Sequence, residues 1–212
     1  MLDKTNGAAL SSGQIGWSGV VRFLHITPRA ALPMRAMSVV NLIAGKGIAG
    51  DRYMTGEGSY SHLRAEDAQL TLFELETLIA LKRDAGIDFG PEEHRRNVTV
   101  EGVPLNHLVG RHFWLGATLL EGTRLVEPCR HIEKITGKAI SKQLINRSGL
   151  YCKILQGGIV RVGDVVRNAP EYANVSTSPT RNHGDTPLPL PASGYISMHF
   201  ISRMITSVRS RF

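Results

Sequence analysis

The chain has 212 residues, a formal net charge of +7 at pH 7 and 42% hydrophobic residues, which is an ordinary composition for a globular protein. It has no run of 18 apolar residues and no secretory signal pattern, so we expect a cytoplasmic protein without a membrane partner. The positive charge is dispersed and aromatic residues are few, so nucleic acid is not the expected partner, and an anionic small ligand explains the charge equally well.

The first quarter of the chain predicts short strands joined by turns. Residues 1–17 are rich in glycine and serine and predict a flexible leader. Residues 20–27 and 37–44 predict two strands. Residues 45–53 carry three glycines within six residues but lack the order of a phosphate-binding loop, so we predict an irregular turn instead. Pairing or capping by Asp51 and Arg52 would stabilise this turn.

The next segment combines a helix with a candidate anion site. Residues 69–73 predict a short strand, and residues 74–84 predict an amphipathic helix that ends at Gly86. Residues 95–100 predict another strand, in which period-two alternation places Arg95 and Asn97 on one face. Two such donors side by side suit a phosphate or a carboxylate, and the alternative is a solvated sheet edge.

Cys129 lies where the predicted structure changes from strand to helix. Residues 117–126 predict a strand pair around Gly122, and apolar residues recur at helical spacing over residues 132–144. A cysteine at a helix start faces unpaired backbone N–H groups, which stabilise the thiolate over the thiol, and the cationic residues that follow add to this. The pattern agrees equally with a reactive thiol and with a small buried hydrophobic residue.

The last third of the chain predicts a hairpin and then a tail. Apolar runs on either side of Gly157-Gly158 predict a hairpin over residues 149–166. Residues 168–212 hold five of the ten prolines and only two acidic residues, so we predict a disordered tail. Many short strands and a few short helices indicate a mainly β (α+β) fold, most simply a β-barrel.

The other residues with chemical potential have structural explanations. Cys152 lies in a strand-like stretch and is predicted to be structural, as is His25, a core histidine with satisfied hydrogen bonds. For His131 the sequence leaves two roles equally open: a base or a helix-start donor, or a surface or capping residue. Asp51 and Glu76 are predicted to stabilise the fold and not to perform chemistry.

Four short motifs occur in order along the chain. They are Gly47-x-x-Gly50-Asp51-Arg52, Arg95-x-Asn97-Val98 followed by Gly102, Pro128-Cys129-Arg130-His131, and Gly157-Gly158-x-x-x-Val162-Gly163-Asp164. In this order and spacing they resemble the MOSC domain family, named for the C-terminal domain of molybdenum cofactor sulfurases. The resemblance covers about residues 18–167 and implies a β-barrel similar to the barrel domain of pyruvate kinase.

The resemblance implies two functions for Cys129. In the first, Cys129 ligates molybdenum in the molybdenum cofactor, Arg95, Asn97 and Arg52 bind the cofactor, and a separate reductase supplies electrons for reduction of N-hydroxylated compounds. In the second, Cys129 carries sulfur as a persulfide, received from a cysteine desulfurase that depends on pyridoxal phosphate, and passes it to the assembly of metal–sulfur cofactors. The chain is too short for the additional barrel domain of the amidoxime-reducing relatives and lacks the cysteine set of a ferredoxin.

Overall fold

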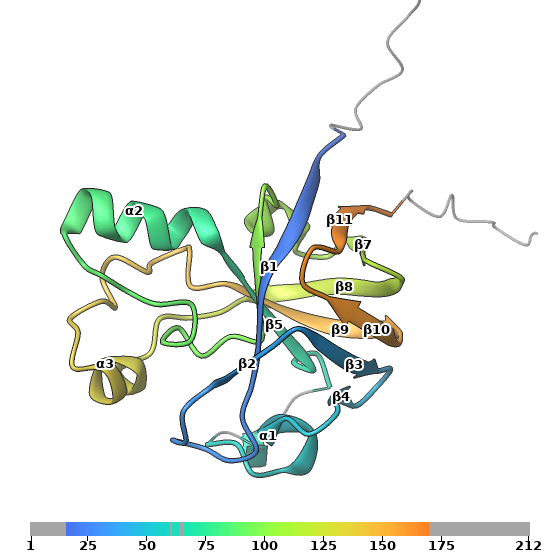
Figure 1. Ribbon diagram of the computed structural model, residues 1–212, viewed down its shortest axis with the longest axis horizontal. Helices are drawn as coiled ribbons and strands as arrows, with labels where there is room; N and C mark the ends of the chain where they lie inside the picture. Colours follow the sequence, from blue (N-terminus) through green and yellow to red (C-terminus); the bar gives the residue numbers. More distant parts are fainter. Residues whose placement is uncertain (1–15, 60, 64–65, 170–212) are drawn as a thin grey trace, which may run out of the picture. The chain divides into compact units, whose positions relative to one another are not determined.

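The computed structural model describes residues 16–59, 61–63 and 66–169, and these residues build a β-barrel (Figure 1). The leader predicted at residues 1–17 and the tail predicted at residues 168–212 lie almost entirely outside the described residues. Both predictions therefore remain predictions.

Seven strands close the barrel, because hydrogen-bonded neighbours form a complete ring. In order around the ring they are β1 (Ser18–Ile26), β11 (Val165–Asn168), β7 (His112–Leu115), β8 (Thr118–Leu125), β9 (Leu150–Gln156), β5 (Leu70–Glu74) and β6 (Val98–Glu101). Only β5 and β6 pair in parallel, and the other pairs in the ring are antiparallel. The predicted mainly β barrel is confirmed.

Four further strands flank the ring. Strand β2 (Arg35–Met37) pairs with β1, whereas β10 (Gly158–Arg161), β3 (Val39–Ile43) and β4 (Gly47–Ile48) form a separate three-stranded sheet. The buried side chains Val40, Leu42 and Val160 join this sheet to the barrel core.

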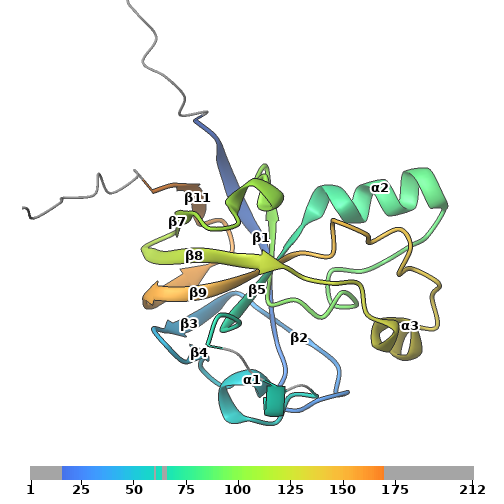
Figure 2. The ribbon, with the colours of Figure 1, turned by 180° about the vertical axis from the view of Figure 1, so that it is seen from behind.

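Three short helices complete the described part of the chain: α1 (Arg52–Thr55), α2 (Leu75–Ala85) and α3 (Arg130–Thr136). Helix α2 ends at Gly86 in the left-handed conformation, as predicted. Both views show α2 and α3 on the same side of the barrel (Figure 1, Figure 2). Within the described ranges, none of the helices combines the length and the apolar character that crossing a membrane would require.

Strand alternation explains the core. In β7, Phe113 and Leu115 are fully buried whereas His112 is exposed. Strand β5 is buried on both faces, because Leu72 packs in the barrel core and Phe73 packs in a second cluster with apolar residues of α2 and α3. This second cluster attaches the two helices to the barrel wall.

Two predicted turns are wrong. Gly122 lies inside β8, and the chain turns between β7 and β8 at Gly116 instead. A Cβ atom at position 122 would lie 2.2 Å from the carbonyl oxygen of Leu108, so this glycine permits a close backbone approach. Gly157-Gly158 does not close a hairpin either, because β9 pairs with β5 and β8 whereas β10 pairs with β3.

The helix predicted over residues 132–144 is too long. Helix α3 ends at Thr136, and Gly137 follows in the left-handed conformation. Ile140 and Leu144 lie beyond the helix, Leu144 in a turn, but both are buried in the same cluster as Ile132. The apolar spacing therefore predicted correctly which residues are buried, but it predicted a helix that is too long.

Candidate functional site

A pocket beside the barrel brings Cys129 together with three arginines. Its lining residues come from α1 and the loop after it, from the segment before β6 and from the start of α3, and they are Arg52, Tyr53, Ser59, Arg95, Arg96, Cys129, His131 and Ile132. The cavity volume is about 60 Å³. Three of the four residues selected from the sequence, Cys129, Arg95 and Arg52, line this pocket.

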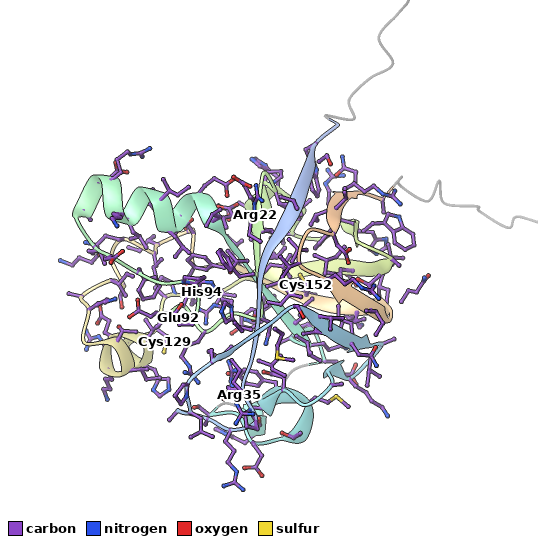
Figure 3. The ribbon with its side chains drawn as sticks, in the orientation of Figure 1. Arg22, Arg35, Glu92, His94, Cys129 and Cys152 are labelled. Atoms are coloured by element: carbon purple, nitrogen blue, oxygen red, sulfur yellow. The ribbon has the colours of Figure 1, made fainter. Side chains whose placement is uncertain are left out.

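The two cysteines occupy opposite environments (Figure 3). Cys129 lies on the side of the molecule where α3 begins, whereas Cys152 lies among the barrel strands. Cys129 is half-buried and is the N-cap of α3, where its Sγ accepts a hydrogen bond from the backbone N–H of His131 at 3.3 Å. Cys152 is fully buried, and burial raises the pKa of its thiol far above the usual range. The predicted helix-start position of Cys129 and the structural role of Cys152 are confirmed.

Asp51 and Arg52 form a buried pair, of which Arg52 lines the pocket. Arg52 is 4% exposed, and its Nη1 lies 3.4 Å from Asp51 Oδ1 while its Nη2 donates to the carbonyl oxygen of Arg95 at 3.0 Å. The Asp51 carboxylate also accepts hydrogen bonds from the backbone N–H groups of Thr27 and Tyr53. The predicted pairing and capping are confirmed, and the capped helix α1 is an element that the sequence did not predict.

Arg95 and Asn97 do not share a strand face, so this prediction is wrong. Strand β6 begins at Val98, and Arg95 lies before it with φ +59°, in the left-handed region. Arg95 lines the pocket, and its guanidinium donates to the carbonyl oxygen of Leu32 at 3.0 Å. Asn97 is 3% exposed, and its side chain bonds to Thr71 and to the backbone of β1. Asn97 is not among the residues that line the pocket. Its predicted contact with the cofactor therefore remains a prediction.

Arg96 is the residue that sequence reasoning missed. Its guanidinium donates to the carbonyl oxygen and the hydroxyl of Ser148, at 3.1 and 3.2 Å. Burial lowers the pKa of Arg96, and the negative charges of Tyr151, Tyr53 and Cys129 act in the opposite direction when these groups ionise. Arg96 remains protonated at every physiological pH, so it places a permanent cation beside the Cys129 thiol.

Among the described residues that line the pocket there are three arginines and no carboxylate. Burial lowers the pKa of Arg95 first, and the neighbouring charges of Arg52 and Arg96 lower it further. Asp51 opposes this effect, but its carboxylate is already engaged by Arg52 and by two backbone N–H groups. An anion bound among the three guanidinium groups would relieve their mutual repulsion. The pocket is therefore a candidate anion site, and Cys129 is among its lining residues.

His131 lies at the pocket, whereas His25 is buried in the barrel. The backbone N–H of His131 contacts Cys129 Sγ and its side chain lines the pocket, which agrees with a helix-start donor and leaves a base role as a prediction. His25 is buried as predicted, but its Nδ1 has no hydrogen-bond partner among the described residues, so it is not fully satisfied. Burial lowers the pKa of His25, and the charge of Glu92 opposes this. In the described ranges, no three His, Cys, Asp or Glu side chains form a group that could hold a metal ion.

Glu74 and Glu76 stabilise the fold at the start of α2. Glu76 accepts a hydrogen bond from the backbone N–H of Gly102, which agrees with the structural role predicted for it. Glu74 accepts one from the backbone N–H of Leu105, and burial raises the pKa of its carboxyl.

Comparisons with known proteins match both the motifs and the barrel. The family model described as MOSC domain matches residues 59–167, just over half of the chain. The crystal structure of the YuaD protein from Bacillus subtilis is 18% identical, with a TM-score of 0.60, and covers 72% of this chain and 99% of its own. YiiM from Geobacillus stearothermophilus is 14% identical, with a TM-score of 0.56 and coverage of 73% and 77%. YiiM from Escherichia coli is also 14% identical, with a TM-score of 0.52 and coverage of 74% and 70%. At these identities the structures show a shared fold alone, and no curated protein matches the sequence significantly.

Proposed function

The chain belongs to the MOSC domain family, and from this premise we propose that it binds the molybdenum cofactor with Cys129 as the protein ligand of the metal. The observation that carries the proposal is the pocket whose lining brings Cys129 together with Arg95 and Arg96. The cofactor joins a thiophilic metal to a pterin phosphate, and the lining would supply a thiol for the metal and guanidinium groups for the phosphate.

The donor chemistry of the pocket fits this group. A thiolate is a soft ligand that suits a thiophilic metal. Guanidinium groups bind phosphate through charge-assisted hydrogen bonds, so Arg95 and Arg96 would hold the pterin phosphate. Arg52, whose guanidinium already contacts Asp51, would contribute mainly through its charge. Asn97 would support the arginine segment from inside the barrel.

The chain contributes position and charge, and the bound cofactor supplies two-electron chemistry that suits reduction of an N-hydroxylated compound. Cys129 is fixed at the N-cap of α3, and Arg96 is fixed by two hydrogen bonds to Ser148. These contacts hold thiol and cation in place before any ligand arrives, so binding does not have to order them. We propose that a separate reductase delivers the electrons and that the protein acts in the cytoplasm.

A second candidate is a sulfur carrier, and the half-buried position of Cys129 beside Arg96 favours it. An accessible thiolate next to a cation can accept a sulfane sulfur as a persulfide. The donor would be a cysteine desulfurase that depends on pyridoxal phosphate, and the acceptor would be the assembly of a metal–sulfur cofactor.

Molybdenum content distinguishes the two functions. After expression in a host that makes the cofactor, we expect the purified protein to retain molybdenum, Cys129→Ser to lose it and Cys152→Ser to retain it. Arg95→Ala should weaken retention by about ten- to a hundredfold, the loss of one charge-assisted hydrogen bond. Elemental analysis and a persulfide assay on the same samples give the result. Equal molybdenum in wild type and Cys129→Ser refutes the ligand assignment, whereas persulfide without molybdenum establishes the carrier.

A further inference from the structure

His94 is fully buried directly behind the arginine segment of the pocket, and no sequence pattern singled it out. Its ring stacks on Phe73 with the centroids 4.3 Å apart. Its Nδ1 accepts a hydrogen bond from the backbone N–H of Arg96 at 2.9 Å, and its Nε2 lies 2.9 Å from the hydroxyl oxygen of Thr99. Both ring nitrogens are therefore engaged, one of them by a residue that lines the pocket.

These two contacts fix the protonation of the ring. A backbone N–H can only donate, so Nδ1 of His94 must present a lone pair to Arg96. The proton of the neutral ring is then on Nε2, which donates to Thr99. A second proton on Nδ1 would place two donors against each other and break the contact with Arg96.

The contact with Arg96 spans two residues, as in a turn closed by an asparagine or aspartate side chain. The residue inside this turn is Arg95, whose φ of +59° costs about 1–2 kcal/mol for a residue with a Cβ atom. The hydrogen bond from Arg96 to His94 offsets this cost. It also sets the direction in which the two successive arginine side chains leave the backbone.

We propose that His94 is a positioning residue, whose Nδ1 lone pair holds Arg95 and Arg96 in the orientation that makes the Cys129 pocket an anion site. His94 touches neither Cys129 nor the pocket lumen and acts only through the backbone of Arg96. The inference rests on the proposed function only in taking the pocket's ligand to be an anion, and it requires no particular cofactor.

The groups around His94 keep the acceptor available at neutral pH. Burial lowers the pKa of His94 well below its usual value, and the positive charges of Arg96 and of His25, on β1, lower it further. The rings of His25 and His94 are arranged edge to face, with their centroids 6.5 Å apart. Glu92 is the carboxylate whose charge acts on His25. From β5, the packed group is the uncharged ring of Phe73.

Two substitutions separate the acceptor from the bulk of the ring. The side-chain oxygen of His94→Asn stands where Nδ1 stands and can still accept from Arg96. The amide of His94→Gln reaches instead toward the position of Nε2 and Thr99, and it leaves Arg96 without its acceptor. Both variants lose the stacking on Phe73, so each is the packing control for the other.

The pocket charge is measured by alkylating Cys129 with anionic iodoacetate and with neutral iodoacetamide. Both reagents attack the same thiolate, so the ratio of their rate constants cancels the thiolate fraction and reports the electrostatic potential at Sγ. Cys152 is fully buried and does not contribute under native conditions. Free cysteine gives the reference ratio, and Arg96→Gln shows how far the ratio falls when one cation is removed.

Relative to free cysteine, we expect the wild-type ratio to be about tenfold higher, in the range of electrostatic steering. His94→Gln should lower the ratio by about three- to tenfold, because the arginines lose their orientation, whereas His94→Asn should stay within about twofold of wild type. Equal ratios in wild type and His94→Gln overturn the proposal, and so do equal losses in the two variants. The assay needs no cofactor, so a protein that retains no molybdenum but separates these variants refutes the proposed function and supports this inference.

A measurement on the wild-type protein covers the case in which neither variant folds. The ¹⁵N chemical shifts of the assigned His94 ring at pH 7 report which nitrogen carries the proton. A neutral ring protonated at Nε2 is expected, and a ring protonated at Nδ1 or at both nitrogens overturns the proposal.

Discussion

At the scale of single residues, two buried histidines connect the stability of the barrel to pH. Burial lowers the pKa of His25, and it lowers the pKa of His94 well below the usual range. In the unfolded chain both rings titrate near about 6.5, so below that pH the unfolded state binds more protons than the folded state. The stabilisation is complete above about pH 6.5 and is lost as the pH falls toward the folded pKa values.

We therefore expect the free energy of unfolding to fall between pH 7.5 and pH 5.5, by up to about 1.4 kcal/mol per pH unit for each histidine. Urea unfolding at a series of pH values measures the slope. His94→Asn should be less stable than wild type at pH 7.5 and should show a shallower slope below pH 6.5. An unchanged slope in this variant would show that His94 is not a source of the pH dependence.

Motif spacing in the sequence identified Cys129, Arg52 and Arg95 as residues of one site. Arg96 and His94 could not be found in this way, because their roles follow from the left-handed backbone at Arg95. An arginine carries no sequence signal for that conformation, which is held by a contact with a side chain behind it. Period-two alternation would separate Arg96 from Arg95, whereas both residues line the pocket in the structure.

At the scale of elements, the segment after α3 is tied to the loop that leads to the arginines. The Lys138 ammonium lies 2.6 Å from both carboxylate oxygens of Glu93 and donates to the carbonyl oxygen of Asp88. The Glu133 carboxylate accepts hydrogen bonds from the backbone of residues 140 and 141, and these bonds lower the pKa of Glu133. These contacts connect the two walls of the pocket, one with Cys129 and one with Arg95.

Lys138→Met should therefore destabilise the fold more than Lys82→Met, although each removes one lysine charge. The side chains of Lys138 and Glu93 are 33% and 25% exposed, whereas those of Lys82 and Asp88 are 72% and 88% exposed. We expect Lys138→Met to lower the free energy of unfolding by about 0.5–1 kcal/mol and Lys82→Met to leave it nearly unchanged. Urea unfolding of the three proteins gives the comparison, and equal effects would show that the connection contributes nothing.

Local signals predicted the elements better than their connections. Gly86 ended α2 where the sequence placed the end, because a left-handed glycine is a local requirement. Gly157-Gly158 has the same appearance as a hairpin turn, yet a Cβ atom at Gly157 would lie 2.5 Å from the carbonyl oxygen of Leu42. Glycine is needed here because β3, more than a hundred residues earlier in the chain, passes close to its backbone. No local sequence pattern predicts that contact.

At the scale of the whole molecule, composition and turn frequency predicted a mainly β barrel, but they could not predict its strand order. The ring closes through β11, which pairs with β1 and with β7. The pairing of β1 with β11 joins Ser18 to Arg167, nearly the full length of the described chain. Such contacts are fixed only when the whole barrel forms, so the closure became visible only in the structure.

Closure through β11 predicts a sharp boundary for truncation. Val166 is fully buried, and β11 bonds on both sides, so a chain that ends after Asp164 leaves β1 and β7 with open edges and exposes the core. A chain that ends after Ala169 keeps β11 and removes the proline-rich, acid-poor segment. We expect the Tm of the longer truncation to stay within about 2 °C of the full chain, a change of at most about 1 kcal/mol. The shorter truncation should give no cooperative transition. A large fall in Tm for the chain that ends after Ala169 would show that residues 170–212 stabilise the barrel, and the predicted boundary would be wrong.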